Sequence, residues 1–257
     1  MAAISVVIPS RNDAELLAVC LAALAAQTRP ADEILVVDNA STDATAQVCE
    51  AAGVRRLPEL VPGVTAATAA GLDAAGGTLL ARLDADSVPP RRWLEQLERR
   101  FDAEPGLAAV TGPGDFYGGG PLAAWVGRTV YIGGYHRVVG LLLGHPPLFG
   151  SNFAIRAEAW RRISGRVDRT DPRVHDDLHI SYLIEPDMEV RWDPDLRVGV
   201  SARPLQSWAG LRRRLAMAYA TFRFDFRRQP PLARRRERVR RRRIPRAGTA
   251  NPPRRRT

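Results

Sequence analysis

The decisive stretch of this sequence is Thr78-Leu79-Leu80-Ala81-Arg82-Leu83-Asp84-Ala85-Asp86, in which an apolar run ends in two acids one residue apart. A buried strand that ends in this way can direct carboxylate oxygens at a hard divalent cation, which in turn neutralises a diphosphate. The spacing alone is weak evidence, because 17 Asp in 257 residues give about one Asp-x-Asp by chance. A second copy, Asp193-Pro194-Asp195, has no apolar strand before it. The surrounding sequence must therefore decide.

Around this stretch, short apolar runs alternate with Ala- and Leu-rich segments. Strands are predicted at residues 4–8, 33–38, 54–57 and 78–83, and helices at residues 13–27, 43–53, 64–75 and 91–101. This alternation predicts βαβ units and an α/β fold with a mostly parallel, Rossmann-like sheet flanked by helices. Polar clusters follow three of the strands, at residues 10–13, 38–41 and 84–86. Ligands bind at the carboxyl ends of parallel strands, so these clusters should form one site.

Beyond residue 105 the pattern changes to Gly-rich, mixed segments, which predict loops that receive a second substrate. A strand is expected at residues 150–155, and helices at 157–163, 175–184 and 205–226. We therefore expect one catalytic domain over residues 1–228, with a nucleotide-binding half at 1–104 and an acceptor half at 105–228. Residues 229–257, rich in Arg and Pro, are expected to be a mostly disordered basic tail.

The charge is concentrated at the end of the chain. Residues 223–257 hold 15 Arg against two acids, whereas the first 222 residues are slightly acidic, although the whole chain carries +10. We expect this segment, with Tyr219, Phe222, Phe224 and Phe226 beside it, to contact an anionic membrane surface. A simple disordered basic tail stays open as the alternative.

The cellular location is predicted from the rest of the composition. No signal peptide or spanning segment is evident, and Cys20 and Cys49 have no metal or redox spacing. We therefore expect a cytoplasmic protein with buried thiols, at most peripheral at the inner face of the plasma membrane.

Four motifs, in order, resemble those of the family 2 glycosyltransferases, enzymes of the GT-A fold that use nucleotide sugars. They are Ser5-Val6-Val7-Ile8-Pro9-Ser10-Arg11-Asn12, Ile34-Leu35-Val36-Val37-Asp38-Asn39-Ala40-Ser41-Thr42-Asp43, Asp84-Ala85-Asp86, and Gly150-Ser151-Asn152 followed by His175-Asp176-Asp177. The resemblance covers residues 4–215. It implies a sugar transferase that takes its donor from a nucleoside diphosphate.

The resemblance also implies roles on the donor side. The nucleotide would be bound by Pro9, Ser10, Arg11, Asp38, Asn39, Ser41 and Asp84, and Asp86 would ligate Mn²⁺ or Mg²⁺. Asp38 can accept the N3–H of uracil, which favours a UDP-sugar. Asp38 or Ser41 could instead only cap the next helix. Arg213 or Arg214 could contact the diphosphate, with a solvated helix face as the alternative.

On the acceptor side, the resemblance implies that Asp177 is the base that removes the acceptor's hydroxyl proton, in a single displacement with inversion. The acceptor pocket would include Gly150, Ser151, Asn152, Trp160 and Asp176. Trp160 could equally be a core residue, and the two acids could merely favour a helix N-terminus. A zinc site at His175 and His179 is disfavoured, because no third ligand is evident. A polyprenyl-linked or cell-envelope acceptor would suit a membrane-associated enzyme of bacterial type.

One departure concerns the donor. Many relatives read Ala-Arg-Asn-x-Gly after the third strand, where this chain has Ala67-Thr68-Ala69-Ala70-Gly71, so an Arg that often contacts the nucleotide is missing. Arg82 is a possible substitute. Two other functions stay open as alternatives. One is a nucleotidyltransferase, disfavoured because the loop after the first strand has no Gly, and the other is a non-catalytic protein that binds a sugar nucleotide or an anionic surface. Specific nucleic-acid binding is not expected, because few aromatics interleave with the basic tail.

Overall fold

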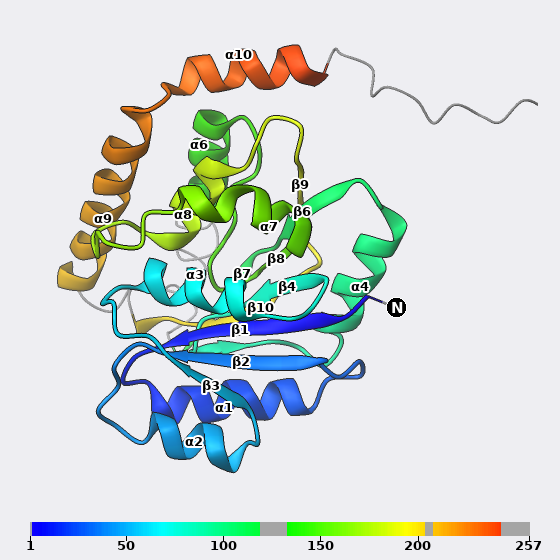
Figure 1. Ribbon diagram of the computed structural model, residues 1–257, viewed down its shortest axis with the longest axis vertical. Helices are drawn as coiled ribbons and strands as arrows, with labels where there is room; N and C mark the ends of the chain where they lie inside the picture. Colours follow the sequence, from blue (N-terminus) through cyan, green and yellow to red (C-terminus); the bar gives the residue numbers. More distant parts are fainter. Residues whose placement is uncertain (1, 119–132, 204–207, 243–257) are drawn as a thin grey trace, which may run out of the picture.

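The computed structural model describes residues 2–118, 133–203 and 208–242, and within them the main sheet has seven strands in the order β3-β2-β1-β4-β8-β6-β9 (Figure 1). The strands of the main sheet are β1 (Ile4–Ser10), β2 (Glu33–Asp38), β3 (Arg55–Pro58), β4 (Leu79–Arg82), β6 (Leu107–Thr111), β8 (Phe153–Arg156) and β9 (Glu189–Trp192). Strands β3, β2, β1 and β4 are parallel, whereas β8 is antiparallel to both of its neighbours. The predicted α/β fold with a mostly parallel sheet is confirmed.

The central strands are mostly apolar and are buried, because helices cover both faces of the sheet. All seven residues of β1 are buried. Helices α1 (Ala14–Ala25), α2 (Thr45–Ala51) and α4 (Trp93–Ala103) lie on one face. Helices α3 (Val64–Ala74), α7 (Ala157–Ile163) and α8 (Asp176–Leu183) lie on the other.

The register aligns the strand ends that carry the polar clusters. Ser10 at the end of β1 pairs with Asp38 at the end of β2, and Val7 pairs with Arg82 at the end of β4. The loops that follow these strands therefore leave the sheet at the same edge. This is the edge at which the sequence predicted a ligand site.

The region after residue 105 has more regular structure than expected. Instead of loops alone, it contains β6, β7 (Gly114–Tyr117) and α6 (Gly133–Leu143). Strand β7 joins β10 (Val198–Ser201) and β5 (Ser87–Val88) in a small three-stranded sheet. Because β8 inserts between β4 and β6, the two predicted halves share one continuous sheet. Their division into donor and acceptor halves stays a prediction.

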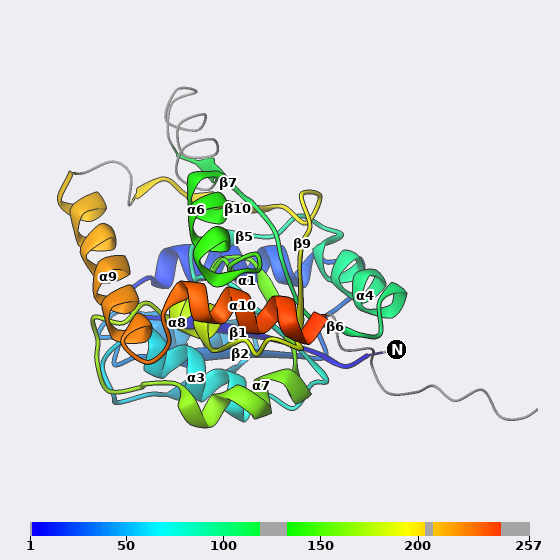
Figure 2. The ribbon, with the colours of Figure 1, turned by 90° about the horizontal axis from the view of Figure 1, so that it is seen from above.

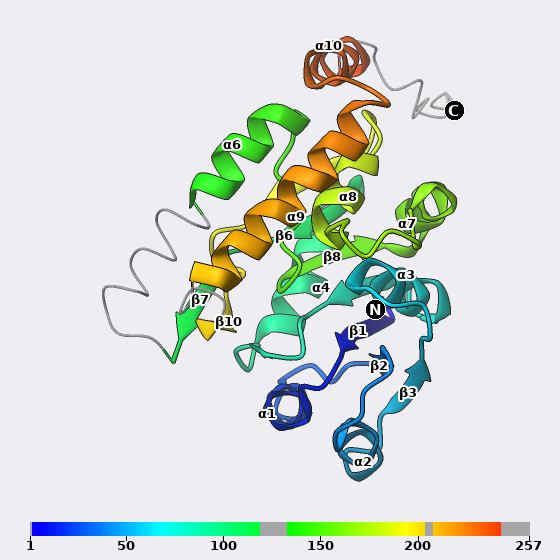
Figure 3. The same cartoon turned by 90° about the vertical axis from the view of Figure 1, so that its left-hand side faces the viewer.

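The end of the chain forms two helices, α9 (Trp208–Phe226) and α10 (Pro231–Arg242), so the expectation of disorder from residue 229 is wrong over α10. Helix α9 lies against α8, and α10 runs across the C-terminal end of α6 (Figures 2 and 3). Residues 243–257 lie outside the described part of the chain.

The aromatic residues of α9 are arranged differently from the predicted membrane border. Phe222 and Phe226 stack on each other and pack on the core, and of this group only Tyr219 is largely exposed. Among the described residues, no helix is both long and apolar enough to cross a membrane. Cys20 and Cys49 are buried free thiols, as expected.

Candidate active site

A buried arginine organises the centre of the site. Arg82, on β4, is 1% exposed and lies between two acids, with its Nη1 2.6 Å from Asp84 Oδ1 and its Nη2 2.8 Å from Asp176 Oδ2. The charge of these carboxylates raises the pKa of Arg82 although burial lowers it. Arg82 therefore joins the Asp-x-Asp motif to the start of α8. Its guanidinium is occupied inside the protein, so its suggested role as a substitute nucleotide ligand is wrong.

The two acids of the Asp-x-Asp motif have different surroundings. Asp84 accepts a hydrogen bond from the Ser151 hydroxyl in addition to its ion pair with Arg82. Asp86 is partly exposed, and burial together with the charge of Asp84 raises its pKa to about 6. The guanidinium of Arg203, with Nη2 3.6 Å from Asp86 Oδ2, and the charge of Arg214 oppose this shift. Such a concentration of carboxylate charge, with oxygen donors only, fits a hard divalent cation.

The candidate base, Asp177, is held in place from two sides. Its Oδ2 accepts a hydrogen bond of 2.9 Å from the backbone N–H of Gly150, and its Oδ1 lies 2.7 Å from His175 Nδ1. Burial lowers the pKa of His175, but Asp177 and Asp176 raise it well above the ordinary value, which favours an ion pair between His175 and Asp177. The predicted base is thus a carboxylate in an ion pair with a histidine.

Gly150 and Ser151 connect the two ends of the site. Ser151 bonds to Asp84, and Gly150 bonds to Asp177. A Cβ atom at position 150 would lie 2.7 Å from Arg82 Nη1 and 3.2 Å from Asp177 Oδ2, so no larger residue fits there without displacing them. The close approach explains why glycine occupies this position.

Asp176 does not face the acceptor, which corrects the prediction. It is fully buried, and its Oδ2 accepts hydrogen bonds from Thr68 Oγ1 at 2.7 Å and from Arg82. Burial raises the pKa of Asp176, but Arg82, His175 and Thr68 together hold it well below the ordinary range. Thr68 therefore supports the start of α8.

The histidine next to these acids does not complete a zinc site with His179. His175, Asp176 and Asp177 have ligand atoms within 4.8 Å of one another. The ring of His179, however, is buried elsewhere, with Nδ1 2.8 Å from Asp225 and Nε2 accepting from the Asp168 N–H. Since Asp176 already pairs with Arg82 and Asp177 with His175, these side chains bind one another in the structure, and the role of Asp177 as the base stays a prediction.

On the donor side, the loops after β1 and β2 are bound to each other. The Asn12 N–H donates to Ser41 Oγ, and Asp38 accepts from the Ser41 N–H at 2.9 Å and from Arg56 Nη1 at 2.7 Å. Burial raises the pKa of Asp38, but these two partners hold it below the ordinary value, so Asp38 is ionised. Helix capping by Asp38 is not seen, because its partners are in the loop itself and on β3.

Other predicted donor residues fall into two groups. Pro9 and Ser10 are buried at the end of β1, and the Ser10 hydroxyl has no hydrogen-bond partner among the described residues, whereas Arg11 is exposed. Asn39 is different: its amide bonds to the backbone of Glu59, Val61 and Gly63, so its side chain supports a loop, and a nucleotide contact by Asn39 stays a prediction.

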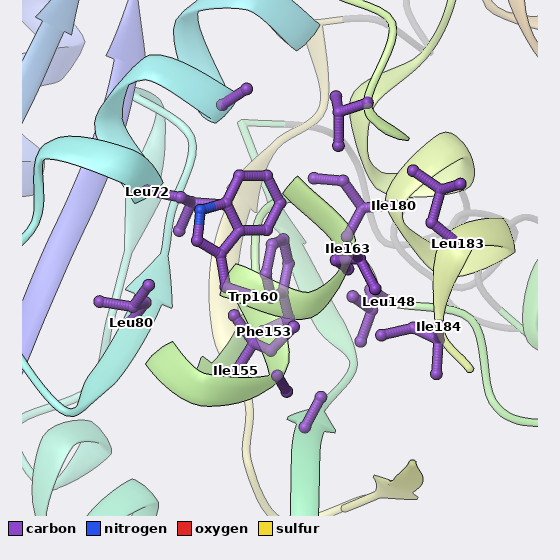
Figure 4. Packing of buried hydrophobic residues seen from close by; sticks show 14 of the residues in the cluster. Leu72, Leu80, Leu148, Phe153, Ile155, Trp160, Ile163, Ile180, Leu183 and Ile184 are labelled. Carbon is purple, nitrogen blue, oxygen red and sulfur yellow. The ribbon is translucent and has the colours of Figure 1, made fainter. Parts of the chain in front are cut away.

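Two predicted acceptor residues are structural. Asn152 is fully buried and bonds to Trp93, Pro113 and Leu196. Trp160 is 1% exposed, packs in the core between Leu72 and Phe153, and donates its indole N–H to Asp73 (Figure 4). The core alternative for Trp160 is therefore confirmed, and sugar stacking by it is wrong.

Several residues of the site were not found from the sequence. Arg203 follows β10 and lies between Asp13 and Asp86, at 2.9 and 3.6 Å. Arg56 reaches Asp38 from β3. Burial lowers the pKa of His136, on α6, to about 4, and the charge of Asp177 acts against this shift. No local spacing marks these residues, because each reaches the site from a distant element. The charge of Arg214 acts on Asp86, whereas the side chain of Arg213 lies outside the described residues.

The chain was compared with known proteins. The family model described as "Glycosyl transferase family 2" matches residues 5–163, more than half of the chain. A glycosyltransferase of Haloferax volcanii, AglE, is 35% identical over 125 residues, which cover 45% of this chain and 38% of the relative. An uncharacterized glycosyltransferase of Mycobacterium bovis is 39% identical over 110 residues, covering 43% and 48%. The chain thus spans less than half the length of these two relatives.

Solved structures show the same fold. A mannosyltransferase from Pyrobaculum calidifontis, in complex with GDP-Man and Mn²⁺, matches with a TM-score of 0.69 and 22% identity over 93% of this chain and 68% of that chain. Residues 1–349 of TarS from S. aureus match with a TM-score of 0.61 and 15% identity, covering 78% and 61%. At these identities the likeness concerns the fold, which is GT-A.

Proposed function

Because this chain belongs to glycosyl transferase family 2, we propose that it transfers a sugar from a nucleoside-diphosphate donor to a hydroxyl acceptor, with a divalent cation and with inversion at the anomeric carbon. The observation that carries the proposal is the shared anchoring of the Asp-x-Asp motif and the candidate base. Arg82, Gly150 and Ser151 connect Asp84 to the start of α8, where Asp177 lies. A transferase needs a metal-diphosphate site and a base at a fixed separation, and a shared anchor for Asp84 and Asp177 would provide that separation.

The donor diphosphate would lie at Asp86. A Mn²⁺ or Mg²⁺ ion held there, with Asp84 beside it, would neutralise the diphosphate as it leaves. Arg203 and Arg214 would bind phosphate oxygens, and the action of both charges on the Asp86 carboxylate supports this assignment. A cation that binds at Asp86 would leave Arg203 free to turn to the donor.

Asp38 and Arg56 suggest which base is recognised. A carboxylate accepts N–H groups and a guanidinium donates to carbonyl oxygens, so the pair matches a base with an N–H beside a carbonyl, as in uracil or guanine. Each oxygen of Asp38 already accepts one protein hydrogen bond, from Ser41 and from Arg56. A carboxylate oxygen has a second lone pair, which would accept the N3–H of uracil, so we propose a UDP-sugar.

In the chemical step, Asp177 would take the proton from the acceptor hydroxyl, and the hydroxyl oxygen would attack the anomeric carbon. The bond from that carbon to the diphosphate breaks, and the diphosphate leaves with the electron pair. The Gly150 N–H fixes the orientation of the Asp177 carboxylate, and His175 compensates its charge. The centroids of the His136 ring and the partly buried Trp192 ring are 3.9 Å apart. These two rings, instead of Trp160, would form the wall that receives the acceptor.

Release of nucleoside diphosphate from a panel of UDP-, GDP- and other nucleotide sugars tests the proposal. It would be measured with Mn²⁺, Mg²⁺ or EDTA for the wild type, Asp86→Ala and Asp177→Asn. Asp195→Ala is the matched control, because Asp195 is an exposed acid in the second Asp-x-Asp sequence, outside this site. We expect metal-dependent release from a UDP-sugar, lost in Asp86→Ala and kept in Asp195→Ala.

For Asp177→Asn we expect kcat to fall by about 10²–10⁴ while the donor still binds. Unchanged kcat in this variant would refute its role as the base. Release of GDP alone would overturn the proposal that the donor nucleotide contains uracil, but it would keep the proposed reaction class. A protein that bound none of the donors, with or without metal, would not be a nucleotide-sugar transferase.

A further inference from the structure

Helix α10 is amphipathic in the opposite sense to an ordinary surface helix. It buries arginines: Arg238 is 4% exposed and donates to the carbonyl oxygens of Met188 and Glu185 at 3.1 and 2.9 Å. It exposes its largest apolar side chains, with Leu232 69% and Val239 52% exposed. A helix that only packed on its own domain would bury the apolar side chains and expose the charges. The exposed side of α10 is therefore suited to something outside the chain.

The buried side of α10 is built to keep this orientation. Arg234 donates to the carbonyl oxygen of Ile184 at 3.1 Å and lies over the ring of Tyr182, 4.4 Å from its centroid. With Arg238, it satisfies carbonyl oxygens near the end of α8 and in the turn that follows. These contacts determine which side of the helix faces outward.

The outward side has an apolar centre and basic edges. Leu232 and Val239 are seven residues apart, so they lie on the same side of the helix, two turns from each other. The exposed Arg235 lies on one flank of this stripe, and the exposed Arg236 and Arg240 lie on the other. A helix of this kind lies in the plane of a lipid interface, with its apolar residues inserted and its arginines at the headgroups.

Helix α6 extends the same end of the molecule. Its C-terminal end meets α10, where a Cβ atom at Gly144 would lie 3.4 Å from Arg235 Cγ, and both helices lie at the end away from α2 (Figures 1 and 3). Val138 and Leu141, one turn apart on α6, are each 60% exposed, and Arg137 beside them is exposed. The apolar and basic pattern of α10 is thus repeated on its neighbour.

We propose that this α6–α10 face binds the surface of a bilayer that contains anionic lipid. Helix α10 holds seven Arg and one acid, and residues 243–257 add five Arg with no acid. The partner must therefore be strongly anionic and also accept apolar side chains, which a bilayer does. A second copy of the chain would place two arginine-rich helices against each other in a symmetric interface, and the like charges would repel. The proposal is independent of the sugar transfer proposed above.

Co-sedimentation of the full chain with vesicles tests the proposal. Vesicles of phosphatidylcholine with 30% phosphatidylglycerol would be compared with pure phosphatidylcholine vesicles. Binding is expected to the anionic vesicles and to weaken with salt. Replacing Arg235, Arg236 and Arg240 by Gln should weaken it on the order of 100-fold, from the usual contribution of a basic residue near such a surface. Leu232→Ser with Val239→Ser should weaken it by roughly tenfold or more.

Leu60→Ser is the matched control, because Leu60 is 82% exposed but lies between β3 and α3. It should bind as the wild type does. None of these changes touches Arg234 or Arg238, so each variant should keep the circular dichroism of the wild type and its release of nucleoside diphosphate in solution.

Three results would overturn the proposal. The first is equal binding to both kinds of vesicle. The second is undiminished binding by the apolar and the arginine variants. The third is a dimer, seen by analytical ultracentrifugation and lost in Leu232→Ser with Val239→Ser, without vesicle binding, which would identify a second copy as the partner. If the wild type turned over no donor, the proposed sugar transfer would be refuted, but the proposed membrane binding would not be affected.

Discussion

Replacing Arg82 by Met should destabilise the protein by about 3 kcal/mol or more, because it leaves a buried carboxylate without its counter-charge. Arg82 and Asp176 are 1% and 0% exposed, so water cannot replace the lost partner. Removing one member of a buried ion pair costs about 3–5 kcal/mol. We expect the lower part of that range, because Asp176 keeps the Thr68 hydroxyl and His175. The total free energy of unfolding of a protein domain is about 5–15 kcal/mol, so the loss is large but measurable.

The double variant Arg82→Met, Asp176→Asn separates the charge effect from the packing effect. It removes the uncompensated charge, so it should be more stable than Arg82→Met alone. In a double-mutant cycle we expect a coupling energy of about 1.5–3 kcal/mol between the two positions. Arg82→Lys keeps the charge but cannot form the same two-pronged contact with Asp84 and Asp176, so its stability should lie between wild type and Arg82→Met.

The pH dependence gives the prediction its sign. Burial raises the pKa of Asp176, but Arg82 and the other partners lower it well below its ordinary value. A carboxyl with a depressed folded pKa stabilises the protein above its unfolded pKa of about 3.9, and this contribution is lost as the pH falls through the folded pKa. Without Arg82 the folded pKa of Asp176 rises, so Asp176 protonates at a higher pH. The difference in the free energy of unfolding between wild type and Arg82→Met should therefore be larger near pH 7.5 than at pH 4.5.

Urea unfolding followed by tryptophan fluorescence, at both pH values and without metal, measures these free energies. A loss below about 1 kcal/mol at pH 7.5, or a gap that widens at acid pH, would refute the argument that Arg82 and Asp176 form a desolvated pair. Turnover should fall as well, since Asp84 and α8 lose their common anchor.

Glycine and tryptophan positions give three further predictions. Gly150→Ala would bring a Cβ atom to 2.7 Å from the Arg82 guanidinium and 3.2 Å from the Asp177 carboxyl group, so kcat should fall about tenfold. Gly165→Ala is the control, because a Cβ atom there would have no neighbour within 4 Å, and its kcat should be unchanged. Equal kcat values for the two variants would contradict the close packing at Gly150. Gly71→Ala would place a Cβ atom 2.4 Å from a valine methyl on the sheet and should cost about 1–3 kcal/mol in urea unfolding. Gly134→Ala, with no atom within 4 Å, should instead stabilise its helix slightly. Trp160→Phe should lose about 1–2 kcal/mol of stability with its indole hydrogen bond, and a raised KM for the acceptor would restore the stacking role.

The N-terminal half of the fold could be predicted from the sequence because its signals are local. The runs at β1, β2 and β4 are apolar on both faces, and each is followed by a helical segment and preceded or ended by turn residues. Parallel order then follows from the connections, and it brings Ser10, Asp38 and Asp84 to one edge. After residue 105 this rule fails: β6 and β9 pair in parallel across 80 residues, and β8 runs antiparallel between β4 and β6.

The sequence by itself determined where a site would form, since polar and acidic residues follow three strands whose parallel order brings them to one edge of the sheet. Only the tertiary structure decided what each side chain does there. Asp176 and Asp177 are adjacent in the chain, yet one is buried against Arg82, 94 residues away, and the other faces Gly150 and His175. The burial that separates their roles is produced by packing between distant elements, and that packing has no periodicity or spacing in the sequence from which it could be predicted.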